Sequence, residues 1–121
     1  MTPTRPRPVV HLELHTPDLD RATSFYLRLL GWHPQVVETG NSPYVSVDVG
    51  MSGGIVECGT AQPLWIPYVE VTDVARATAR ACALGASILL APREGPTGWR
   101  SVMTSYASGQ IAFWQPKAGP S

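Results

Sequence analysis

The sequence is poor in charged residues, has only two cysteines and contains no long apolar run. Charged residues make up 15% of the 121 residues, and nine basic side chains balance nine acidic ones, so the formal net charge is zero. Because no basic stripe is present, nucleic acid is not an expected partner. No apolar run approaches the roughly 20 residues of a membrane-spanning helix, so we expect no membrane partner either.

The two cysteines, Cys58 and Cys82, make neither a disulfide framework nor a metal-binding motif. Such sparse cysteine suits a reducing compartment. The proline-rich start lacks the apolar segment of a signal peptide. Together these features predict a cytoplasmic protein. The one glycine pair, Gly53-Gly54, does not stand between a predicted strand and a predicted helix, so it does not indicate a nucleotide site.

An internal repeat is the most informative feature of the chain. His11–Asp18 reads HLELHTPD and continues as LDRATSFYLRLLG, while Ile66–Asp73 reads IPYVEVTD and continues as VARATARACALG. In both copies an aspartate is placed to cap a helix, the apolar residues have helical spacing, and a glycine ends the pattern. The chain is therefore predicted to be a tandem duplication, with its functional cavity between the two copies.

Each copy has the predicted order βαβββ, which gives an α+β fold. The first module, residues 9–59, is expected to hold strands over 9–15, 32–38, 44–49 and 54–58 and a helix from Asp18 to Gly31. The second module, residues 64–116, is expected to hold strands over 65–71, 87–91, 101–106 and 110–115 and a helix over 74–84. Residues 40–43 and 50–54 are predicted turns, 60–63 a linker and 92–98 a loop. Residues 1–8 and 117–121 are predicted tails of a single domain that spans residues 1–121.

This pattern resembles the vicinal oxygen chelate superfamily, which contains glyoxalase I, extradiol dioxygenases, fosfomycin-resistance enzymes and bleomycin-binding proteins. The most specific segments are DLDRATSFY at Asp18–Tyr26 with the following LLGW, WIPYVEVTD at Trp65–Asp73, and SGQIAFWQP at Ser108–Pro116. The resemblance implies two modules whose curved mixed sheets surround a cavity. It also implies a homodimer in which module one of one subunit completes a cavity with module two of the other.

The resemblance further implies metal-ligand positions near the start of the first strand and on the last strand of each module. In the first module these positions hold His11 and Glu57, which are candidate ligands. In the second module they hold Ile66 and Phe113, neither of which coordinates a metal. A catalytic divalent metal normally keeps three protein ligands. We therefore expect no metal and no other cofactor.

A cavity without metal is expected to bind its ligand by stacking and apolar contacts. The candidate ligand-binding residues are His11, Tyr44, Glu57, Ile66, Tyr68, Trp99, Met103 and Phe113, and no catalytic residue is assigned. Trp99 is the most telling of them, because it follows a Pro-Thr-Gly segment in a loop expected at the cavity mouth. A hydrogen bond between His11 and Glu57 is the alternative to direct ligand contact by this pair. Glu13, His15 and Glu70 share the predicted cavity side, and Tyr68 with Glu70 are the alternative ligands of a shifted metal site.

Three functions are compatible with these residues. The first interpretation is a metal-free protein that sequesters an aromatic or polycyclic small molecule, in the manner of the antibiotic-binding resistance proteins. The second is a metal-dependent lyase, isomerase or dioxygenase that uses His11, Glu57 and a further ligand. The third is a metal-free enzyme in which His11 exchanges protons.

Overall fold

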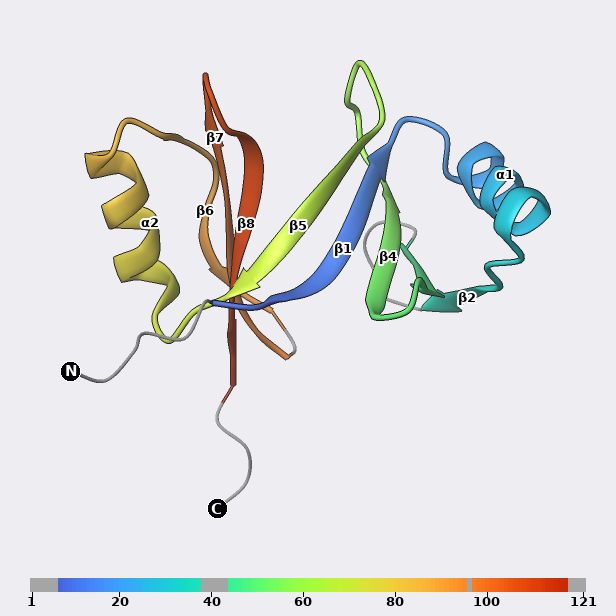
Figure 1. The fold of residues 1–121 in the computed structure, drawn as a ribbon, viewed down its shortest axis with the longest axis horizontal. Helices are drawn as coiled ribbons and strands as arrows, with labels where there is room; N and C mark the ends of the chain where they lie inside the picture. Colours follow the sequence, from blue (N-terminus) through green and yellow to red (C-terminus); the bar gives the residue numbers. More distant parts are fainter. Residues whose placement is uncertain (1–6, 38–43, 96, 118–121) are drawn as a thin grey trace. The chain divides into compact units, whose positions relative to one another are not determined.

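The computed structural model describes residues 7–37, 44–95 and 97–117, which form eight strands and two helices (Figure 1). The elements of the first module are β1 (Val9–Thr16), α1 (Leu19–Leu30), β2 (Pro34–Val37), β3 (Tyr44–Asp48) and β4 (Ser52–Glu57). Those of the second module are β5 (Leu64–Glu70), α2 (Val74–Ala83), β6 (Ser87–Glu94), β7 (Gly98–Ser105) and β8 (Gly109–Pro116). The predicted α+β class and the βαβββ order of both modules are confirmed.

The chain divides into two compact units, Val10–Ile66 and Pro67–Ser121, with Met1–Val9 belonging to the second. The strand order in the first unit is β2-β3-β4-β1, with β1 and β4 parallel and the other pairs antiparallel. In the second unit the order is β6-β7-β8-β5, and again the first strand of the module pairs in parallel with the last. The four strands of each module are therefore ordered and paired in the same way, as the sequence repeat predicts.

Each helix begins at the aspartate that the repeat predicts as its cap. The Asp18 carboxylate accepts from the Arg21 backbone N–H at 3.1 Å, and the Asp73 carboxylate accepts from the Arg76 N–H at 3.0 Å. These bonds satisfy amides that the first turn of a helix leaves without a partner. Gly31 ends α1 with a left-handed φ of 72°, which favours glycine.

A second side chain, from the last strand of the same module, also caps each helix. Glu57 of β4 accepts from the Leu19 N–H with 3.1 Å between nitrogen and Oε1. In the second module Gln115 of β8 accepts from the Val74 N–H at 2.8 Å. A hydrogen bond therefore joins the start of each helix to the last strand of its own module.

The strands of the first unit present alternate residues to two faces of the sheet. α1 packs on one face, over a core of Leu14, Leu19, Val45, Val47 and Ile55. By alternation, His11, Glu13 and His15 lie on the other face, which we call the His11 face. The strand register adds Ser52 and Gly54 of β4 and Tyr44, Ser46 and Asp48 of β3 to the His11 face.

Three aromatic side chains extend the first core. Tyr26 of α1 stacks on Trp32 with 5.3 Å between ring centroids, and its hydroxyl accepts from Trp65 Nε1–H at 3.0 Å. All three are packed against the buried core. Trp32 and Trp65 therefore support the scaffold of the first unit, with the indole N–H of Trp65 satisfied.

In the second unit a buried hydroxyl pair identifies the face that α2 covers. Thr78 of α2 and Ser101 of β7 are both buried, and their hydroxyl oxygens lie 2.7 Å apart. Residues that share the alternation of Ser101 therefore lie on the α2 face. The register places Phe113 of β8 opposite Ser101, so Phe113 also lies on this face.

Some predicted boundaries are wrong. The predicted loop over 92–98 is mostly strand, because β6 extends to Glu94 and β7 begins at Gly98. The predicted turn over 50–54 is shorter, since β4 already begins at Ser52. The predicted turn over 40–43 lies outside the described residues. Within the part of the chain that is described, neither helix is long and apolar enough to cross a membrane.

Candidate functional site

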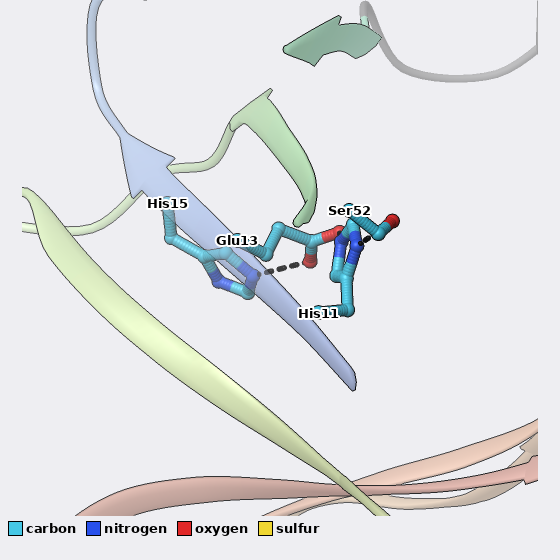
Figure 2. A network of polar contacts seen from close by, with 4 residues as sticks. All are labelled: His11, Glu13, His15 and Ser52. Atoms are coloured by element: carbon cyan, nitrogen blue, oxygen red, sulfur yellow. Dashed lines mark hydrogen bonds and ion pairs between the residues drawn. The ribbon is translucent and has the colours of Figure 1, made fainter. Parts of the chain in front are cut away.

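A buried carboxylate between two imidazoles is the centre of the His11 face (Figure 2). The Glu13 side chain is only 6% exposed. Its Oε2 lies 2.8 Å from His15 Nε2, and its Oε1 lies 3.5 Å from His11 Nε2. Alternation along β1 places these three side chains on one face. A buried carboxylate needs such donors, because an unpaired one is expensive to remove from water.

Ser52 of β4 completes the network on the side of His11. The parallel register pairs His11 with Ser52, and the distance from His11 Nδ1 to Ser52 Oγ is 2.7 Å. An ionised Glu13 only accepts, so the Nε2 atom of each neighbouring imidazole carries its proton. A neutral His11 then has its lone pair on Nδ1, where it accepts from the Ser52 hydroxyl. One assignment of protons is thus consistent with all three contacts of the network in Figure 2.

Tyr44 of β3 lies across the same face because β4 has a glycine beneath it. A Cβ atom built on Gly54 would be 2.7 Å from Cζ of the Tyr44 ring, closer than real Cβ contacts. The parallel register pairs Gly54 with Glu13. The tyrosine ring therefore lies next to the carboxylate network, and the absence of a side chain at Gly54 makes room for it.

A polar hollow adjoins the network within the first unit. It has a volume of about 370 Å³ and is lined by His33, Gln35, Ser46, Val47, Asp48, Met51, Ser52 and Gly53. Ser52 belongs both to this hollow and to the hydrogen-bond network. None of the lining residues is an arginine or lysine. The hollow offers hydroxyl, amide, imidazole and carboxylate groups rather than an aromatic slot.

The structure separates Glu57 from His11, which contradicts the alternative of a hydrogen bond between them. Glu57 pairs with Thr16, five residues along β1 from the His11–Ser52 pair. That separation is about 16 Å along the strand. Five residues also reverse the face, which is why Glu57 points to α1 and caps Leu19. The acidic partner of His11 is Glu13.

The expected equivalence of Glu57 and Phe113 is also wrong. Thr16 pairs with Glu57 in the first sheet. In the second sheet region, Glu70 pairs with Trp114. The repeat aligns Thr16 with Val71, the residue after Glu70, so the residue level with this counterpart is Gln115. The alignment that paired Glu57 with Phe113 is therefore two residues out of register. The matching helix caps of Glu57 and Gln115 agree with the corrected register.

The remaining predicted site residues lie on β5, β7 and β8. Met103 and Trp99 share the alternation of Ser101, so they lie on the α2 face with Phe113. Trp99 is half-buried within β7 rather than in a loop, and Lys117 Nζ lies 5.8 Å from its ring centroid. Ile66 and Tyr68 are buried in β5. Within the first unit, the structure brings His11 and Tyr44 to one face of the sheet, and contact of any predicted residue with a ligand stays a prediction.

The residues of this face do not match a metal centre. Among the described residues, no three His, Cys, Asp or Glu side chains form a group that would hold a metal ion. The Glu13 oxygens face the two imidazoles, so the carboxylate serves the histidines as an acceptor. We derive no chemistry through a metal at this face.

Sequence reasoning placed Glu13 and His15 on the correct side of the sheet but left them out of the site. The signal that identifies them is the alternation His-x-Glu-x-His in β1, which places two bases beside one acid. Ser52 had no such signal, because its contact with His11 depends on the pairing of β1 with β4.

Comparison with solved structures identifies the fold. A methylmalonyl-CoA epimerase in complex with methylmalonyl-CoA and NH4+ aligns with a TM-score of 0.62 and 15% identity, over 93% of this chain and 96% of the other. A variant of the Streptomyces coelicolor methylmalonyl-CoA epimerase, in complex with 2-nitronate-propionyl-CoA, aligns with a TM-score of 0.61 and 16% identity, over 95% and 98% of the two chains. A hypothetical protein from Bacillus halodurans C-125 aligns with a TM-score of 0.70 and 9% identity, over 97% and 99%. The chain has the vicinal oxygen chelate fold.

These comparisons show the fold alone. The sequence identities of 15%, 16% and 9% are too low to assign a function to this chain. No protein-family model matches the chain, and no curated protein matches it in sequence. Sequestration of an antibiotic finds no support in them, since the named neighbours that carry an activity are epimerases.

Proposed function

We propose that this protein is an enzyme that binds a small carbonyl compound on the His11 face and transfers a proton with His15. The observation that carries the proposal is the 2.8 Å contact between His15 Nε2 and the buried Glu13 carboxylate. A carboxylate in this position holds an imidazole in one tautomer and stabilises its protonated form. The proposal therefore assigns His15 as the catalytic base and acid, and Glu13 as the positioning residue.

The exposure of the two side chains supports this division of roles. The His15 side chain is 19% exposed, three times as much as that of Glu13. Within residues 7–37, 44–95 and 97–117, His15 Nδ1 has no hydrogen-bond partner, so its lone pair is available to a ligand. Histidine is the side chain that most often transfers protons near neutral pH.

The neighbours with the same fold support a class of chemistry for this proposal. An epimerase inverts a stereocentre, and at a carbon beside a carbonyl this chemistry proceeds by loss and return of a proton. One neighbour is a methylmalonyl-CoA epimerase that holds methylmalonyl-CoA. The inference for this chain is the class of chemistry, proton transfer beside a carbonyl, and methylmalonyl-CoA is one probe of it.

Sequestration is the competing function, and the placement of the aromatic side chains disfavours it. Stacking on Trp99 and Phe113 is its main physical basis, yet both lie on the α2 face of the second sheet. On the His11 face Tyr44 is the aromatic residue beside the carboxylate network. One ring gives less stacking area than the aromatic cavity that sequestration requires.

Solvent-deuterium exchange tests the proposal. The purified protein is incubated in D2O with methylmalonyl-CoA or dihydroxyacetone, in the presence of EDTA, and loss of the proton beside the carbonyl is followed by NMR. We expect exchange with at least one probe, and His15→Ala should slow it by about 10²–10⁴-fold, the usual contribution of a general base. Glu13→Gln should slow it by at least about tenfold, because the amide no longer stabilises the imidazolium.

Glu57→Gln is the matched control. It makes the same acid-to-amide change on the opposite face, and Gln115 shows that an amide makes the same cap. Its exchange rate should equal that of the unchanged protein. Binding of a probe without exchange would support sequestration instead. Exchange that requires an added divalent metal would support a metal-dependent enzyme. Unaltered exchange in His15→Ala would refute the role given to that residue.

A further inference from the structure

Ser52 is an exposed hydroxyl held by an imidazole. It is the first residue of β4, and its Oγ lies 2.7 Å from His11 Nδ1. The Nε2 atom on the other side of the His11 ring faces Glu13 Oε1 at 3.5 Å. The three side chains form a line of hydroxyl, imidazole and carboxylate, which Figure 2 shows from close by.

This line has the parts of a serine nucleophile with its base. A serine hydroxyl is a weak nucleophile until a neighbouring base accepts its proton, and that base is oriented by a third group. Such sets are recognised by geometry and roles rather than by sequence order. Here the proton assignment that satisfies the network already has the Ser52 hydroxyl donating to His11 Nδ1. The 3.5 Å contact with Glu13 is long, as is common for catalytic hydrogen bonds before a substrate binds.

We propose that Ser52 is a nucleophile that accepts an acyl group from a short-chain ester or thioester. Oγ bonds to the acyl carbon, and the bond from that carbon to the leaving sulfur or oxygen breaks. The hydroxyl proton passes to His11 Nδ1 and then to the leaving thiolate or alkoxide. Water next attacks the acyl carbon and gives a proton to His11, and Oγ recovers that proton as the carboxylic acid departs.

The polar hollow gives the donor a place beside the hydroxyl. Ser52 lines it together with Ser46 and Asp48 of β3 and Gln35 of β2. No lysine or arginine is among its lining residues, and the Asp48 carboxylate there would repel an acidic acyl chain. The surface therefore suits a short, uncharged or hydroxylated acyl group.

The step does not rest on the proposed proton transfer. It uses His11 on one side of Glu13, whereas proton transfer uses His15 on the other. Ser52→Ala should therefore abolish acylation while solvent-deuterium exchange stays measurable, and His15→Ala should largely remove exchange while acylation stays measurable. These two variants therefore distinguish a failure of the acylation proposal from a failure of the proton-transfer proposal.

Labelling with a fluorophosphonate and with p-nitrophenyl acetate tests the proposal on the full chain. We expect one covalent adduct per chain by intact mass, located at Ser52 by peptide mapping, and a burst of p-nitrophenol. Ser52→Ala should abolish both. His11→Ala should slow labelling by at least about 10²-fold, the lower range for loss of a general base. Ser108→Ala is the matched control, since Ser108 is exposed and its hydroxyl contacts Ser105 rather than a histidine.

A second measurement covers the case in which His11→Ala does not fold. In Ser52→Cys the new thiol should react with iodoacetamide at least about tenfold faster than the exposed native Cys82, because His11 promotes the thiolate. Labelling of the folded protein elsewhere than Ser52 would overturn the proposal. So would equal labelling rates with and without His11, or equal alkylation of the two thiols.

Discussion

Glu13 is a carboxylate at a position where an apolar side chain would cost less to bury. Its side chain is almost covered, and both imidazoles beside it are partly open to water. Replacing a buried ionic group by an apolar residue of similar size is often neutral or stabilising. Glu13→Leu should therefore keep the free energy of unfolding within about 1 kcal/mol or raise it, while it removes proton transfer.

Urea denaturation of Glu13→Leu, with deuterium exchange on the same sample, checks this expectation. Glu57→Leu is the comparison, because it removes a carboxylate that caps a helix and should cost about 1 kcal/mol. If Glu13→Leu loses several kcal/mol, the network is a structural element of the fold. The functional site of the protein would then have to lie outside the network of Glu13 and the two histidines.

Gly54 leaves room for the Tyr44 ring, and a side chain at this position should remove that room. Gly54→Ala places a methyl group against the Tyr44 ring, and such overpacking costs about 1–3 kcal/mol unless the ring moves. We expect a lower free energy of unfolding and a weaker affinity for any ligand that contacts Tyr44, measured by urea denaturation and by calorimetry. At Gly59 an added Cβ meets nothing within 4 Å, so Gly59→Ala should not destabilise the protein.

The hydrogen bonds by which the last strands cap the helices can be tested by substitution. Gln115→Ala removes the acceptor for the Val74 N–H and should cost about 1 kcal/mol, the usual value of a helix cap. Gln115→Glu keeps the bond and adds a negative charge at a helix N-terminus, which should contribute about 0.3–1 kcal/mol. Urea denaturation measures both. Gln62→Ala, in the exposed segment between β4 and β5, is the control and should change nothing.

The helices and their first caps were predictable from the sequence because the signals are local. Asp18, Asp73 and Gly31 act on backbone groups within a few residues of themselves. Strand register is not local. The similar starts Ser52-Gly53 and Ser108-Gly109 suggested one alignment, but the ladders place the second strand two residues differently. Glu57 was for this reason assigned to the wrong face and given the wrong counterpart.

The site was only partly predictable for the same reason. Alternation within β1 placed His11, Glu13 and His15 together, whereas the partner Ser52 depends on a pairing across 41 residues. Trp99 was assigned to a loop because prolines and glycines precede it. Pro92 is tolerated in β6 because β6 is the outer strand of its sheet, with irregular register near that point.

At the scale of the whole molecule, the outer strands expose apolar side chains. Val36 of β2 is 77% exposed and Leu89 of β6 is 53% exposed. Among the described residues, no strand pairs with the outer edge of β2 or of β6, and proteins usually cover or charge such edges. We therefore keep the prediction of a homodimer. Light scattering at micromolar concentration should give twice the 13.0 kDa mass of the chain.

An edge substitution tests that prediction further. Val36→Lys should weaken a dimer that uses β2, because a lysine on an outer strand opposes pairing. Tyr106→Lys is the control at the exposed turn between β7 and β8. A monomeric mass for the unchanged protein would contradict the dimer, and a dimeric mass for Val36→Lys would place the interface away from β2.

The two helix caps allow the two copies of the repeat to be compared at equivalent positions. Glu57 and Gln115 differ in charge and yet make the same bond. His11, Glu13 and His15, by contrast, correspond in the repeat to Ile66, Tyr68 and Glu70. The two copies thus share the hydrogen bond that joins helix to sheet, while the side chains on the corresponding faces of their first strands differ. The proposed chemistry therefore belongs to one copy, and the fold of the other copy does not depend on the histidines.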